Sequence, residues 1–111
     1  MFEFDIEINK LYNLQTVFIF RNPTLNISYV SKTSNVCLSF NLEKISKKEA
    51  NKIVYDFKKA FKLQTEKLSG HPLDYHVKCI FNTNDKATIL KAITEHFNIN
   101  DFVVVDPAQY Q

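Results

Sequence analysis

One long amphipathic segment, residues 46–68, constrains the fold of this chain more than any other feature. Read at about 100° per residue, its apolar side chains fall on a single side, as a helix that packs on a core requires. That stripe consists of Ala50, Ile53, Val54, Phe57, Phe61, Gln64 and Leu68. Ser46 and Glu49 have the spacing of a capping box, and Gly70 followed by Pro72 is typical of a helix end. The sequence therefore predicts a helix over residues 46–68, with Gly70 as its left-handed cap.

The opposite side of this predicted helix carries a basic ridge. Its members are Lys48, Lys52, Tyr55, Lys59 and Lys62. Their alternating spacing of four and three residues gives an outward stripe roughly 21 Å long at the helical rise. Such a stripe attracts phosphates and acidic surfaces, although a solvated helix face is the commoner interpretation. Glu66 stands four residues after Lys62, and we expect the two to pair.

Apolar patterns before this helix predict strands over residues 2–8, 14–20, 25–31 and 36–42. In the first strand, Glu3, Asp5 and Glu7 alternate with apolar residues and form an acidic strip on one face. The second strand is apolar on both faces, and the next two alternate with one apolar face. Because short turn segments join them, we expect an antiparallel four-stranded meander.

Beyond the long helix, the pattern predicts a strand over residues 74–81, a helix over 86–97 and a short buried strand over 102–105. Asn84 or Asp85 is the expected cap of that helix. Strand, helix and strand should form a right-handed parallel crossover. We therefore expect an α+β fold: the meander, then helix, strand, helix and strand, in one sheet with two helices packed on it. Residues 1–111 form one domain in this prediction, with 107–111 as a loose tail.

Composition excludes several function classes. A single glycine cannot build a phosphate-cradling loop, so nucleotide hydrolysis and dinucleotide chemistry are disfavoured. The first residues lack a basic leader, and no apolar run approaches the roughly 18 residues of a membrane span. We therefore expect a cytoplasmic protein without a membrane partner. Cys37 and Cys79 lie in apolar strands, which favours buried reduced thiols over a disulfide.

The net charge of +2 is unevenly distributed, because residues 43–69 hold eight lysines against four acids. The basic excess therefore belongs to the long helix.

Candidate catalytic and metal-binding groups are few. His71, Asp74 and His76 lie close in sequence, which is a weak metal-binding pattern, and an exposed polar edge is the commoner case. A thiol–imidazole pair would need a cysteine beside His76, but alternation along the strand places Cys79 on the opposite face. We therefore assign no catalytic residue, no metal and no cofactor.

These observations favour a small non-enzymatic protein that acts by occupying a macromolecular partner. We expect a protein partner, bound by the basic ridge or by the acidic strip. Size and composition are typical of inhibitors, immunity proteins and accessory proteins of viruses or plasmids. One alternative is a nucleic-acid-binding module that uses the basic ridge. A second is a small enzyme or metal protein that uses Asp74 and His76. A homodimer is a further expectation, because Val17 and Ile19 leave an apolar second face on their strand.

Overall fold

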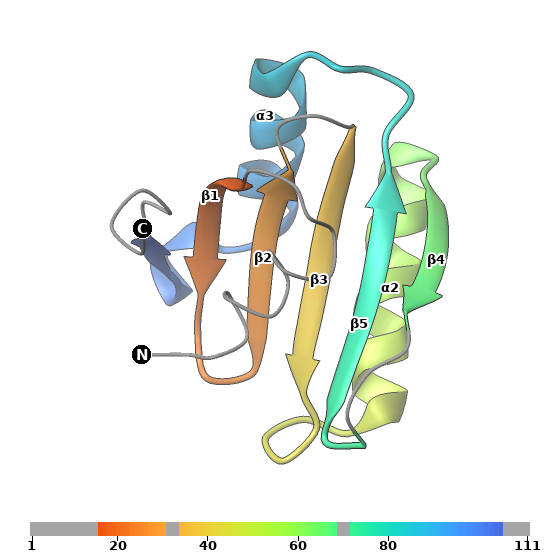
Figure 1. The fold of residues 1–111 in the computed structure, drawn as a ribbon, viewed down its shortest axis with the longest axis vertical. Helices are drawn as coiled ribbons and strands as arrows, with labels where there is room; N and C mark the ends of the chain where they lie inside the picture. The colour runs from red at the N-terminus through yellow and green to blue at the C-terminus, as the bar shows by residue number, and fades with distance from the viewer. Residues whose placement is uncertain (1–15, 31–33, 69–71, 106–111) are drawn as a thin grey trace.

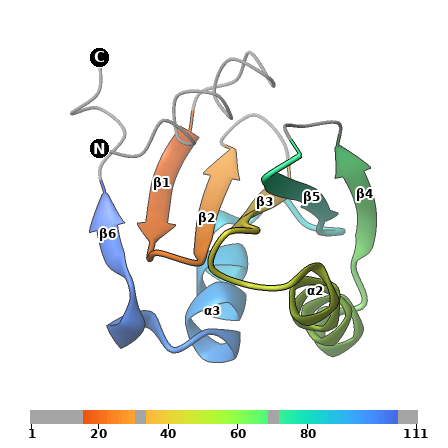
Figure 2. The same ribbon diagram turned by 90° about the horizontal axis from the view of Figure 1, so that it is seen from below.

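The computed structural model describes residues 16–30, 34–68 and 72–105. In this part of the chain one six-stranded sheet carries two helices on the same face (Figures 1 and 2). The strands are β1 (Thr16–Arg21), β2 (Leu25–Val30), β3 (Asn35–Asn41), β4 (Gln64–Leu68), β5 (Asp74–Ile80) and β6 (Val103–Val105). The helices are α2 (Lys47–Phe61), α3 (Lys86–His96) and the 3-10 turn η1 (Ile99–Asp101). The α+β class is confirmed.

The sheet has the strand order β4-β5-β3-β2-β1-β6, and every neighbouring pair is antiparallel. β1, β2 and β3 follow one another as a meander, as predicted. The turn before β2 is built by Asn22, whose Oδ1 accepts hydrogen bonds from the backbone N–H groups of Thr24 and Leu25 at 2.9 and 2.8 Å. The strand predicted over residues 2–8 lies outside the described residues, as does the tail 107–111.

The core lies between the sheet and the two helices. From the sheet it takes the alternating side chains Leu25, Ile27, Tyr29, Val36, Leu38, Phe40, Tyr75, Val77 and Cys79. Phe57 of α2 is fully buried, and its ring centroid lies 5.1 Å from that of Phe97 and 6.0 Å from that of Phe81. This one side chain therefore joins α2 to the end of α3 and to the end of β5.

The start of α2 agrees with the sequence, because Ser46 Oγ accepts the Glu49 N–H at 3.1 Å and donates to Glu49 Oε1 at 3.0 Å. The predicted end is wrong. Lys62 adopts the left-handed conformation (φ 55°, ψ 50°), and the N–H of Leu63 bonds to the carbonyl of Lys58. The predicted stop at Gly70 is replaced by a reversal eight residues earlier, at Lys62, and residues 64–68 form β4 rather than continuing the helix.

The reason for this reversal is geometric. A 15-residue helix is about 22 Å long, which already spans seven-residue strands of about 23 Å. Without β4, the outer edge of β5 would present unpaired backbone groups. Pairing of Thr65 with Cys79 and of Lys67 with Val77 satisfies that edge.

The short C-terminal strand also differs from its prediction. β6 runs in the same direction as β5, as a parallel crossover requires, but β3, β2 and β1 separate the two strands. Val103 and Val104 are 66% and 62% exposed, so the strand is not buried. An apolar run does not distinguish a central strand from an edge strand, and β6 lies at the edge of the described sheet beyond the cover of both helices (Figure 2).

Candidate functional site

The basic ridge lies on the outer side of α2, opposite the buried residues Ala50, Val54 and Phe57. All five members are exposed, and Tyr55 exposes 58% of its surface. Lys59 Nζ lies 5.9 Å from the centroid of the Tyr55 ring, within the range of a cation–π contact. Lys62 belongs to the ridge as the cap of the helix rather than as part of a further turn.

Among the residues that the structure describes, no ion pair engages the lysines of the ridge. Glu66, the expected partner of Lys62, instead pairs across the β4–β5 ladder with Lys78, at 2.9 Å between Nζ and Oε2. The only other ion pair within the described ranges joins Lys91 and Glu95. The lysines of the ridge therefore have no carboxylate partner in this part of the chain, and their charge is available to a ligand.

One flank of the ridge is fixed to the sheet through Tyr75. Lys47 Nζ and Lys67 Nζ lie 5.4 and 5.8 Å from the centroid of its ring, and its hydroxyl donates to Asn51 Oδ1. Asp56 and Glu49 lie on the other flank, and both are exposed. The basic surface is therefore extended on the β4 side and bounded by carboxylates on the α3 side.

Glu3, Asp5 and Glu7, the predicted acidic strip, lie outside the described residues, as does His71.

Asp74 and His76 do not form an open site. His76 is 5% exposed, and its Nδ1 lies 2.9 Å from Ser39 Oγ on the neighbouring strand. Asp74 lies at the start of β5, opposite Asn41 of β3. No group of three or more metal-ligating side chains occurs among the residues that the structure describes. Engagement of a buried imidazole with a hydroxyl favours a structural role for His76.

The sheet face that turns away from the helices carries a buried polar array that sequence reasoning missed. Register places Asn26, Ser39 and His76 in one row across β2, β3 and β5, and Ser28 and Cys37 in the next. Cys37 Sγ lies 3.8 Å from Ser39 Oγ. Asn26 and Ser28 are each 1% exposed, and their side-chain polar atoms have no hydrogen-bond partner among the described residues. The available signal was the polar residues that alternate with the apolar ones in β2 and β3.

Cys37 and Cys79 are both buried and are reduced thiols rather than a disulfide, as expected. Cys79 belongs to the core on the helix side of the sheet, and His76 lies on the other face. The predicted separation of this thiol from the imidazole is therefore correct. Burial, and to a smaller extent the charge of Cys37, raises the pKa of Cys79 to about 12, which makes it a poor nucleophile.

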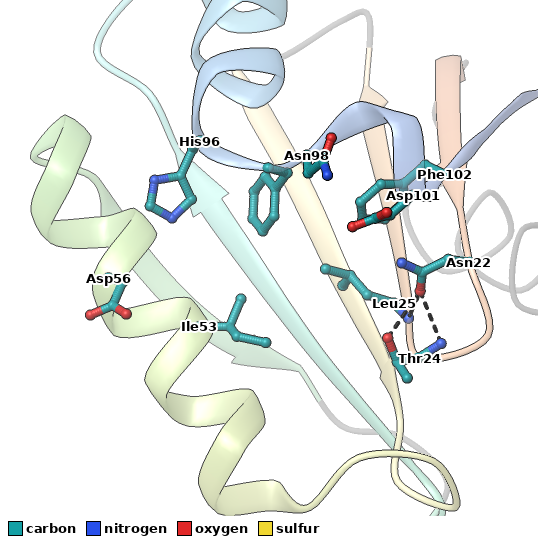
Figure 3. Close-up of a pocket in the computed structure, with 10 residues that line it drawn as sticks. Asn22, Thr24, Leu25, Ile53, Asp56, His96, Asn98, Asp101 and Phe102 are labelled. Atoms are coloured by element: carbon teal, nitrogen blue, oxygen red, sulfur yellow. Dashed lines mark hydrogen bonds between the residues drawn. The ribbon is translucent and has the colours of Figure 1, made fainter.

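A pocket of about 310 Å³ opens where α2, the end of α3 and the β1–β2 turn meet (Figure 3). Its apolar lining consists of Leu25, Ile53, Phe97 and Phe102. Its polar lining consists of Asn22, Thr24, Asp56, His96, Asn98 and Asp101. No sequence motif marked this pocket, because its residues come from three separate segments of the chain.

His96 is the one imidazole at this pocket. Its ring packs against Phe57 and Phe61, with centroids 5.1 and 5.9 Å apart. Burial lowers the pKa of His96 below its ordinary value, and the negative charge of Asp56 opposes that shift. Burial therefore favours the neutral form of this imidazole.

Comparisons with known protein families, with curated protein sequences and with solved structures found no match. In the described ranges, no helix combines the length and the apolar character that crossing a membrane requires.

Proposed function

We propose that this chain is a small binding protein that acts by occupying a macromolecular partner, and that the basic ridge of α2 is its binding surface. The observation that supports this proposal is the run of exposed lysines along one helix face, none of which forms an ion pair with a carboxylate among the described residues. The partner surface would be acidic. Inhibitors, immunity proteins and accessory proteins of viruses or plasmids act by occupancy of this kind.

Three features favour an acidic protein over a nucleic acid. Asp56 and Glu49 border one side of the ridge and would repel phosphates that approach over that flank. Arg21 is the only arginine of the chain, so the ridge lacks the residue that most specific base contacts use. A convex stripe one helix wide also suits a groove or an acidic patch on a folded partner.

The alternative is a nucleic-acid-binding module on the same ridge. Its support is Tyr55, which is exposed beside Lys59 and is able to stack on an unpaired base. Binding of this kind would weaken steeply between low and moderate salt, since phosphate contacts release counterions.

Capture from a host lysate distinguishes these two functions. The purified chain would be immobilised and exposed to lysate with and without nuclease, beside the variant Lys52→Glu/Lys59→Glu. A protein that is retained after nuclease treatment and lost with the variant supports occupancy of an acidic protein. Recovery of nucleic acid alone, again lost with the variant, would establish the alternative. Retention of the same proteins by both forms would refute both roles for the ridge.

The homodimer remains a separate proposal. The side chains of Val17 and Ile19 lie outside the described part of the structure, so the apolar face that we expect them to form is untested. Sedimentation of the chain over a range of concentrations would reveal a dimer.

A further inference from the structure

The strand β4 lies at one end of the described sheet, where only β5 pairs with it. Figure 2 shows no described element beyond its outer edge. In an antiparallel ladder, successive residues direct their N–H and C=O groups to opposite sides. Alternate residues of β4 therefore present main-chain donors and acceptors that no strand among the described residues satisfies. Such an edge is able to accept one further strand.

The two faces of β4 differ in charge. Lys67 pairs directly with the core residue Val77, and paired residues share a face, so Lys67 lies on the helix side of the sheet. Glu66, the only acid of β4, lies on the other face, where its Oε2 is 2.9 Å from Lys78 Nζ. The negative charge of the strand is therefore neutralised away from the helices, while its helix side stays positive.

The flank of α2 beside β4 adds further positive charge. Asn51 marks this flank, because its Oδ1 accepts the hydroxyl of Tyr75 on β5. Lys47 and Lys58 stand one turn before Asn51 and two turns after it, so the helical period places them on the same flank. These exposed side chains, with the cap of α2 and the lysine of β4, are the edge lysines: Lys47, Lys58, Lys62 and Lys67. None of them forms an ion pair with any residue that the structure describes.

Tyr75 holds two of the edge lysines close to each other. The Nζ atoms of Lys47 and Lys67 lie 5.4 and 5.8 Å from the centroid of its buried ring. Two like charges at one ring repel each other, and an acidic group between them would turn this repulsion into attraction. The edge of β4 therefore combines open main-chain groups with a cluster of positive charge.

The positive charge distinguishes between the candidate occupants of this edge. A second copy that paired β4 with β4 would bring two sets of edge lysines together, and facing like charges are destabilising. A nucleic acid offers phosphates but no peptide groups at the repeat of a strand. An extended protein segment with acidic side chains at every second position satisfies both the main-chain groups and the lysines.

We propose that β4 accepts an acidic extended segment of a partner protein as a further strand of the sheet, with the acids of that segment against the edge lysines. This role of β4 rests on the proposed function, because it names the part of an acidic partner that the chain binds. It adds main-chain pairing, which the basic ridge alone does not supply.

The test is a titration of the isotope-labelled, unmodified chain with a capped peptide in which glutamate and valine alternate, followed by backbone amide NMR at low salt. The same peptide with lysine in place of glutamate is the control for charge. Two further forms carry N-methyl groups, one on every glutamate and the other on every valine, so that each form blocks one edge of the peptide strand. We expect saturable shifts at Thr65, Glu66 and Lys67 with the glutamate peptide and none with the lysine peptide. Binding should be lost with only one of the two N-methylated forms.

Three outcomes would overturn the proposal. The first is absence of saturation, or equal affinity of the two N-methylated forms, which would exclude pairing of strands. The second is a concentration-dependent shift of β4 in the free chain, which would assign the edge to a second copy. The third is an equal response of β4 to short single-stranded DNA, which would assign the edge to a nucleic acid. Capture of an acidic protein through the ridge would still support the proposed function in the first two cases, so the two proposals fail separately.

Variants then assign the charge. Lys58→Gln/Lys67→Gln should weaken binding of the glutamate peptide about tenfold or more, because two of the edge charges are lost. The matched control is Lys44→Gln/Lys91→Gln, whose exposed side chains lie in the turn before α2 and on α3. This control changes the net charge equally and should leave binding close to that of the unmodified chain. Equal weakening by both variants would reduce the effect to net charge and reject the site.

Discussion

Ser39 Oγ lies 2.9 Å from Nδ1 of His76, and the two residues face each other across the β3–β5 ladder. Both are buried on the sheet face that turns away from the helices. The hydrogen bond therefore links β3 to β5, the strand that pairs with the edge strand β4. It also satisfies an imidazole nitrogen that would otherwise be costly to bury.

Removal of this hydroxyl should destabilise the fold. We expect Ser39→Ala to lower the free energy of unfolding by about 1–3 kcal/mol, because a buried polar atom of His76 loses its partner. Ser28→Ala is the matched control, since Ser28 Oγ is equally buried but has no hydrogen-bond partner within the described ranges. That change should be neutral or stabilising. Urea unfolding of both variants measures the difference, and equal losses of stability would contradict this role for the Ser39–His76 pair.

Because Lys62 is a left-handed cap, we expect glycine substitutions at Lys62 and at Lys58 to change the free energy of unfolding in opposite directions. Lys62→Gly should raise the free energy of unfolding by about 1 kcal/mol, because a side chain at positive φ carries a steric cost that glycine lacks. Lys58→Gly, one turn earlier within α2, should lower it by about 1 kcal/mol. Thermal or urea unfolding distinguishes the two. If α2 continued through residue 62, both substitutions would destabilise.

The features of the fold that depend on near neighbours were predictable from the sequence. The capping box at Ser46 needs only residues three positions apart, and the alternating faces of β2, β3 and β5 need only a period of two. The end of α2 is different, because Gln64 and Leu68 continue a helical stripe and also fit an edge strand. Residues 64–68 form a strand because they pair with the edge of β5, and this pairing is a long-range property of the fold.

The same distinction applies to the candidate sites. Exposure of the basic ridge followed from helical period alone, and the structure places Lys52 and Lys59 on the expected side of α2. The Ser39–His76 pair depends on strand register, and the pocket depends on the packing of α3 against α2. Neither relationship is visible in a single sequence, because 37 residues separate Ser39 from His76.

Cys79 should be inert in the folded protein. Its pKa of about 12 leaves almost no thiolate at pH 8, and burial blocks access to reagents. Iodoacetamide labelling followed by peptide mass spectrometry should modify Cys79 only after unfolding in urea. Rapid modification of Cys79 under native conditions would contradict its burial.

The raised pKa of Cys79 also makes the free energy of unfolding depend on pH. The folded pKa lies above the ordinary value of 9.0, so the stabilisation is fully present below pH 9 and is lost as pH rises toward 12. Cys79→Val should flatten this part of the stability profile. Urea unfolding between pH 8 and pH 11 provides the measurement, and an unchanged profile in the variant would assign the loss to other groups.

Protonation of His96 should lower the free energy of unfolding as the pH falls. Its folded pKa is lowered, so its contribution to stability is present above the ordinary value of 6.5 and is lost as pH falls through the folded value. His96→Phe keeps a ring against Phe57 and Phe61 but cannot bind a proton. Unfolding measured from pH 8 to pH 5 should show a smaller loss in this variant. Parallel curves for the two proteins would exclude His96 as the source.

The basic ridge of α2 is tested most directly by the dissociation constant of the partner captured from lysate, measured for three forms of the chain at one ionic strength. These are the unmodified chain, Lys52→Glu/Lys59→Glu on the ridge and Lys44→Glu/Lys91→Glu away from it. Both variants change the net charge equally, and all four lysines are exposed. We predict that the ridge variant weakens binding about tenfold or more, while the other stays close to the unmodified chain. Equal weakening by both variants, or none by either, would contradict binding through the ridge.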